Sequence, residues 1–93
     1  MRLDKFLKVA RLAKRRTEAK EALDAGRVVD RRSGRQLKAG YDVKEGDVLE
    51  IHYARKILTV RVAAVPGRVV PGLRPSDLYV IVAERKEDPL EWL

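Results

Sequence analysis

Hydrophobic residues near the start of the chain recur three and four positions apart. At about 100° per residue, this spacing places them on one side of a helix. The apolar side of this expected helix consists of Leu3, Phe6, Leu7 and Ala10. The opposite side consists of the basic residues Arg2, Lys5 and Lys8. The pattern predicts a two-faced helix that ends between Val9 and Arg11.

A second short helix is expected after a basic bend over residues 11–16. Thr17 is suited to cap its amino end, and Glu18 complements the positive end of the helix dipole. A small apolar stripe on this helix consists of Ala19, Ala22 and Leu23. Small residues on the stripe indicate close packing against the first helix. Gly26 fits the left-handed position that commonly ends a helix.

From Gly26 onward the pattern changes to short strands and turns. Segments at 27–29 and 36–38 flank a basic, glycine-containing tip, which predicts a hairpin. Further strands are expected over residues 48–53, 57–62 and 78–82. A surface loop is expected at 66–75 and an acidic tail at 87–93. Helices that precede strands in this way predict an α+β fold.

The composition fits one small domain. A chain of 93 residues has room for a single core, which its 45% hydrophobic content can supply. No cysteine is present, which excludes disulfides, a thiolate nucleophile and zinc–cysteine sites. The sequence has no apolar run long enough for a signal peptide or a membrane span, so we expect a cytoplasmic protein with no membrane partner.

Basic charge is concentrated in the first two-fifths of the chain. Residues 1–38 hold 13 Lys and Arg against 5 Asp and Glu, whereas residues 39–93 hold 8 against 9. Such one-sided charge is typical of a protein that binds a phosphate backbone. Arginine suits this task because its planar guanidinium can bond two phosphate oxygens at once.

Residues 16–28 resemble the signature of the αL RNA-binding domain, the type named after small-subunit ribosomal protein S-four. The shared features are a basic or hydroxyl residue before the helix, alanines on its packed face, a closing glycine and a valine strand. Residues 3–7 resemble the first helix of that domain, and residues 44–47 resemble its closing x-x-G-D turn. The resemblance implies two or three helices packed on a small, mainly antiparallel β-sheet. We expect a single domain over 1–93, with the RNA-binding motif at 1–53, additional strands at 54–86 and the short acidic tail at 87–93.

Within this superfamily, residues 1–8 and 14–17 resemble the RqcP family of small ribosome-rescue proteins, with the fifteen-kilodalton heat-shock protein as a relative. This resemblance implies binding to the rRNA of a stalled large ribosomal subunit and to its peptidyl-tRNA. It also implies support of C-terminal alanine tailing, alongside a tRNA-recruiting alanine-tailing factor. The long basic C-terminal extension typical of the heat-shock relative is not found here, which favours the RqcP-like interpretation. We expect a monomer when the protein is off the ribosome.

The basic bend and the outer faces of the two helices are the expected RNA-binding surface. Its candidate residues are Arg2, Lys5, Lys8, Arg11, Lys14, Arg15, Arg16 and Lys20. The basic face of the first helix has an alternative role in solvating the helix, and Lys20 is equally open to both interpretations. A carboxylate in such a patch repels RNA, so Asp4 is expected to orient a nearby arginine or to complement the helix dipole.

Other polar and aromatic residues have structural interpretations. The hairpin tip over 30–36 carries arginines that could contact RNA or keep the loop soluble; they are Arg31, Arg32 and Arg35. His52, the single histidine, has no catalytic or metal-ligand neighbours in recognisable spacing and is expected half-buried on a strand. Core or sheet packing rather than base stacking is expected for Tyr41, Tyr53 and Tyr79. We expect no catalytic residue, cofactor or metal.

Three other functions compete with rescue of stalled chains. A heat-shock-type factor would recycle large subunits that carry a nascent chain. An RNA-modifying enzyme often contains this domain, but the chain has no room for an attached catalytic domain. A protein-interaction adaptor would act through the apolar residues of the tail. A membrane-surface helix is disfavoured because the apolar face of the first helix is short.

Overall fold

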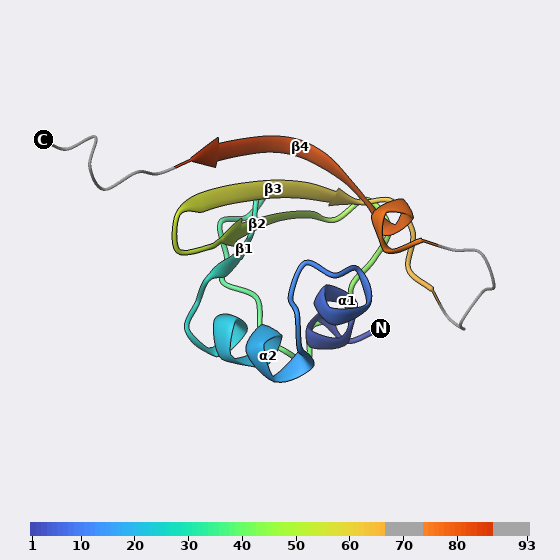
Figure 1. Cartoon of the computed structure of the whole chain (residues 1–93), viewed down its shortest axis with the longest axis horizontal. Helices are drawn as coiled ribbons and strands as arrows, with labels where there is room; N and C mark the ends of the chain where they lie inside the picture. Colours follow the sequence, from blue (N-terminus) through green and yellow to red (C-terminus); the bar gives the residue numbers. More distant parts are fainter. Residues whose placement is uncertain (67–73, 87–93) are drawn as a thin grey trace, which may run out of the picture.

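Two helices lie on one side of a four-stranded antiparallel sheet in the computed structural model, which describes residues 1–66 and 74–86 (Figure 1). The elements in chain order are α1 (Leu3–Val9), α2 (Arg16–Asp24), β1 (Val28–Asp30), β2 (Val48–His52), β3 (Lys56–Val62), the 3₁₀ helix η1 (Pro75–Leu78) and β4 (Tyr79–Lys86). This is the α+β arrangement that the sequence predicts.

The apolar side of α1 forms the centre of the core. All four residues predicted for it are at most 2% exposed: Leu3, Phe6, Leu7 and Ala10. The predicted basic side is exposed, and the helix ends at Val9, so both predictions are confirmed. Arg11 then takes a left-handed conformation with φ of 58°, which turns the chain away from the helix axis.

The start of α2 differs from the prediction. Thr17 was expected as the N-cap, but the helix begins at Arg16 and the N-cap is Arg15. The carbonyl of Arg15 accepts the first helical hydrogen bond, from the Ala19 N–H at 3.0 Å. No side chain caps this end of the helix. Thr17 is the second residue of α2 and therefore lies inside its first turn.

The end of α2 follows the prediction closely. Gly26 has φ of 74°, and its N–H donates to the Leu23 carbonyl at 3.0 Å. The next N–H, that of Arg27, donates to the Ala22 carbonyl at 2.9 Å. These two bonds form a Schellman motif, in which a left-handed glycine satisfies carbonyls that the helix leaves open.

The sheet has the order β1-β2-β3-β4, with every neighbouring pair antiparallel. β1 pairs along its length with the distant β2, and Val28 lies opposite Ile51. On the other side of β1, the returning arm of the predicted hairpin forms one isolated bridge, between Val29 and Gln36, and is not a strand. β4 continues to Lys86, beyond the predicted end, and forms one edge of the sheet.

The aromatic residues and the histidine have the structural roles expected of them. Partly buried tyrosines pack against the core; they are Tyr41, Tyr53 and Tyr79. His52 is half-buried, and its Nε2 lies 2.9 Å from the Glu50 carboxylate on the same strand. Most of the predicted loop at 66–75 and all of the tail at 87–93 lie outside the described residues. The part of the chain described here includes no helix of the length and hydrophobicity needed to cross a bilayer.

Candidate RNA-binding surface

A buried carboxylate joins the two helices at the surface predicted to bind RNA. Asp4 is only 3% exposed although it lies between basic residues. Its Oδ1 accepts hydrogen bonds from the Lys5 backbone N–H at 2.8 Å and from Arg2 Nε at 3.2 Å. Its Oδ2 accepts one from Arg16 Nε at 3.3 Å. The sequence predicts that Asp4 orients one nearby arginine. In the structure it orients two, Arg2 and Arg16.

The protonation state of Asp4 suits this role. Burial alone raises the pKa of its carboxyl group, because a low-dielectric environment disfavours the charged form. The hydrogen bonds from Arg2, Arg16 and Lys5, together with the positive charge of Arg16, outweigh burial and hold the pKa below its ordinary value. The carboxylate is therefore ionised at neutral pH and attracts both guanidinium groups.

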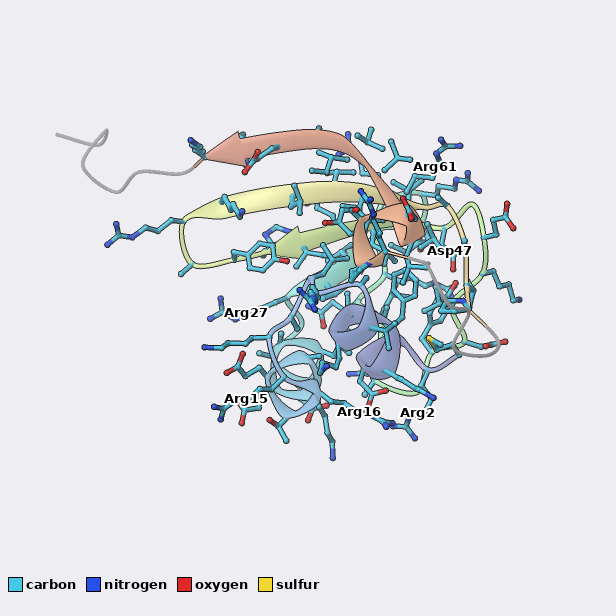
Figure 2. The ribbon with its side chains drawn as sticks, turned by 45° about the vertical axis from the view of Figure 1, so that its right-hand side comes forward. Arg2, Arg15, Arg16, Arg27, Asp47 and Arg61 are labelled. Carbon is cyan, nitrogen blue, oxygen red and sulfur yellow. The ribbon has the colours of Figure 1, made fainter. Side chains whose placement is uncertain are left out.

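We call Arg2, Asp4 and Arg16 the arginine clamp. Its two arginine side chains are 56% and 51% exposed and approach Asp4 through Nε. The remaining guanidinium nitrogens make no hydrogen bond to another residue that the structure describes. Figure 2 shows both arginines on the same side of the helical layer. The clamp thus presents two oriented groups of donors that suit phosphate oxygens.

The basic bend between the helices is attached to the protein at two points. The backbone N–H groups of Leu12 and Ala13 both donate to the Leu7 carbonyl, at 2.9 and 3.0 Å. The Tyr53 hydroxyl, at the end of β2, donates to the Leu12 carbonyl at 2.6 Å. Burial raises the pKa of Tyr53, so this hydroxyl is a protonated donor at neutral pH. These contacts fix the bend, while Lys14 and Arg15 remain exposed.

All the predicted RNA-binding residues are exposed, and they are distributed over α1, the bend and α2. Lys5 and Lys8 lie one turn apart on the outer face of α1. Lys20 lies one turn after Arg16 and thus on the same face of α2 as a clamp residue. The bend contributes the remaining three, Arg11, Lys14 and Arg15. Contact between these residues and RNA remains a prediction.

Arg27 is a basic residue that the sequence analysis did not select. Its side chain is exposed, and its backbone carbonyl accepts a hydrogen bond from the His52 N–H at 2.8 Å. Together with Lys14 it lines a groove between the bend, α2 and the end of β2. The feature of the sequence that could have indicated a role for Arg27 is its position directly after Gly26, the glycine that ends α2.

The hairpin arginines are partly used within the protein. Arg31 pairs with Glu50 at 3.4 Å, and Arg32 donates to the Gly46 carbonyl at 3.3 Å. These contacts favour a structural role for two of the three tip arginines. Among the residues that the structure describes, no group of three or more His, Cys, Asp and Glu side chains could hold a metal ion.

Comparison with known proteins identifies relatives of both the fold and the sequence. The profile of the S4 domain family matches residues 1–49. The chain is 44% identical to the RQC P-site tRNA stabilizing factor of Halalkalibacterium halodurans over 90 residues, which cover 97% of this chain and 96% of the relative. It is 45% identical to the protein of that name from Bacillus subtilis, covering 92% and 96% of the two chains. The corresponding Listeria monocytogenes protein is 40% identical, with 95% and 92% covered.

A solved structure with the same fold supports the architecture independently. The trimeric structure of Vibrio cholerae Heat Shock Protein 15 superimposes with a TM-score of 0.76 and covers 89% of this chain and 82% of that one. The two sequences are 24% identical, so this likeness concerns the fold. The sequence matches and the superposition confirm the resemblance noted from the helices and the closing turn.

Proposed function

This chain belongs to the S4 domain family and, within it, to the RQC P-site tRNA stabilizing factors, and from that membership we propose that it binds structured RNA where tRNA meets the large ribosomal subunit. The proposed RNA ligands are large-subunit rRNA and the peptidyl-tRNA of a stalled chain. The proposed process is ribosome-associated quality control in the cytoplasm, through binding rather than catalysis.

The arginine clamp is the observation that carries this proposal. A buried, ionised carboxylate holds Arg2 and Arg16 in fixed orientations before any ligand arrives. Because less side-chain freedom is then lost on binding, pre-oriented donors bind phosphate more tightly than freely rotating ones. The clamp joins the start of α1 to the start of α2, so it also sets the relative position of the neighbouring basic residues.

The finer steps of the process are part of the proposal. The protein would hold tRNA on the large subunit while a tRNA-recruiting factor supports C-terminal alanine tailing. We also propose that the protein is a monomer when it is not bound to the ribosome. Heat-shock-type recycling of large subunits is the second candidate. It has less support, because the relatives with the higher identity carry the quality-control name, whereas the heat-shock likeness concerns the fold.

Replacement of one clamp arginine tests the proposal. Arg16→Ala is expected to weaken binding to large subunits that carry peptidyl-tRNA by about tenfold or more, since a hydrogen bond to a charged group contributes about 1.5–3 kcal/mol. The measurement is co-sedimentation over a range of protein concentrations. Arg61→Ala is the matched control, because Arg61 is an exposed arginine on β3 and lies away from the clamp (Figure 2). Equal binding by Arg16→Ala, Arg61→Ala and the wild type would contradict the proposed role of the clamp.

A further inference from the structure

Tyr53 connects the basic bend to the far end of the sheet. Its hydroxyl donates to the Leu12 carbonyl in the bend at 2.6 Å. Its backbone N–H donates to the Lys56 carbonyl at 2.9 Å across the β2–β3 turn. Tyr53 therefore links the basic bend to the β2–β3 turn, although the two segments are far apart in sequence.

A groove of about 260 Å³ lies on one side of Tyr53 and is lined partly by basic residues. Lys14 enters it from the bend, and Arg27 from the connection between α2 and β1. The hydrogen bond from the His52 N–H fixes the Arg27 backbone beside the end of β2. The acidic residue on this groove is Glu18, so its two cations outnumber its one anion.

A second hollow on Tyr53 is also lined by basic residues. Its walls are Tyr53, Ala54, Arg55, Lys56 and Lys86. Lys56 lies over the Tyr53 ring, with Nζ 5.3 Å from the ring centroid, and pairs with Glu84 at 3.5 Å. Arg55 and Lys86 form no ion pair with another residue within 1–66 or 74–86.

This concentration of charge is not favourable for the sheet itself. Lys56 and Lys86 lie directly opposite each other on β3 and β4. Like charges in such positions are destabilising. Among the residues that the structure describes, Glu84 is the carboxylate that pairs with Lys56. A surface that brings several cations together is suited to an anionic ligand.

We propose that Lys14, Arg27, Arg55 and Lys86, arranged around Tyr53, form a second phosphate-binding surface for the backbone of an RNA segment beyond the one held by the arginine clamp. This proposal rests on the proposed function and extends its contact area. Figure 1 places the β2–β3 turn and the connection from α2 to β1 on the same side of the molecule. In Figure 2, Arg15 and Arg27 lie on that side, and Arg2 and Arg16 lie further round the helical layer.

The test compares the salt dependence of RNA binding for three variants and the wild type. The double variant Arg55→Gln/Lys86→Gln removes two cations without adding negative charge. Its affinity for a fluorescent double-stranded RNA stem-loop should fall by about tenfold, and its log–log salt slope should become shallower by about 2. Arg61→Gln is the matched control and should bind as the wild type does. Arg27→Gln is an independent single variant, since Arg27 contacts β2 through its backbone, and its slope should change by about 1.

Each result has a definite consequence. If both test variants match the wild type while Arg16→Ala binds weakly, the second surface is wrong and the proposed function stands. If the wild type binds this RNA without salt dependence and Arg16→Ala has no effect on subunit binding, the proposed function itself is wrong. If the variants lose large subunits but still bind both the stem-loop and protein-free large-subunit rRNA as the wild type does, the surface contacts a ribosomal protein, which also overturns the phosphate assignment. Thermal unfolding of each variant, followed by circular dichroism, distinguishes loss of binding from loss of folding. If the double variant is unstable, Arg27→Gln alone decides whether the second surface binds RNA.

Discussion

Asp4 lies where basic side chains from the two helices meet, and it determines their geometry. A carboxylate in a nucleic-acid-binding patch opposes the ligand in simple electrostatic terms. Its burial and its three hydrogen bonds resolve this conflict, because its charge is directed at Arg2, Arg16 and the Lys5 amide rather than at solvent. The negative charge therefore organises the positive surface.

Asp4→Asn is expected to reduce stability and RNA affinity together. Loss of the charge weakens hydrogen bonds to charged partners and should lower the free energy of unfolding by about 1–3 kcal/mol at neutral pH. The pKa of Asp4 is lowered in the folded protein, so its stabilising contribution is fully present above the ordinary value of 3.8 and is lost as pH falls through the folded pKa. Urea unfolding at neutral pH and at about pH 2 should therefore show a difference between wild type and variant that shrinks in acid. A difference that is independent of pH would contradict this role.

At the level of elements, local patterns predicted the helices better than the strand pairings. The buried side of α1 follows from helical spacing, and Gly26 marks the end of α2 because left-handed backbone favours glycine. The start of α2 was predicted wrongly: Thr17 has the chemistry of a cap, but the backbone places Arg15 in that position. The partner of β1 was also missed, because β1 pairs with the distant β2 and no local pattern encodes that pairing.

Replacement of Gly26 tests how strongly the end of α2 depends on its glycine. Gly26 and Gly34 have nearly equal φ values of 74° and 73°. A Cβ at Gly26 would lie 2.7 Å from Gln36 Nε2, whereas a Cβ at Gly34 would meet nothing within 4 Å. Both alanine variants should lose about 1–2 kcal/mol of unfolding free energy from backbone strain, and Gly26→Ala should lose more because Gln36 must move. Chemical denaturation of the pair measures the difference; a larger loss for Gly34→Ala would contradict this account.

At the level of the whole molecule, the fold changes the distribution of charge seen in the sequence. The second part of the chain is nearly neutral in total, yet it contributes Arg55 and Lys86 to the end of the sheet near Tyr53. This contribution could not be predicted, since it depends on the register of β3 and β4 and on the hydrogen bond that joins Tyr53 to the bend. The basic surface is therefore larger than the basic segment.

The salt dependence of wild-type binding measures how much of this surface is used. Each neutralised phosphate releases counterions. The RNA affinity of a protein that makes four phosphate contacts should therefore fall by about a hundredfold as salt rises from about 50 to 200 mM. Fluorescence titration of a labelled RNA stem-loop at several salt concentrations gives the slope. An affinity that hardly changes over this range would be incompatible with binding through phosphates.

The arginine clamp has a further consequence for the lifetime of the protein in the cell. The two arginines that would bind RNA also hold α1 against α2 through their Nε contacts with Asp4. A ligand that binds the native state alone shifts the folding equilibrium by mass action, so occupied protein would open less often than free protein. Proteases act on such opened states. Degradation would then fall more heavily on copies that are not engaged, and the amount of protein would adjust to the number of its binding sites.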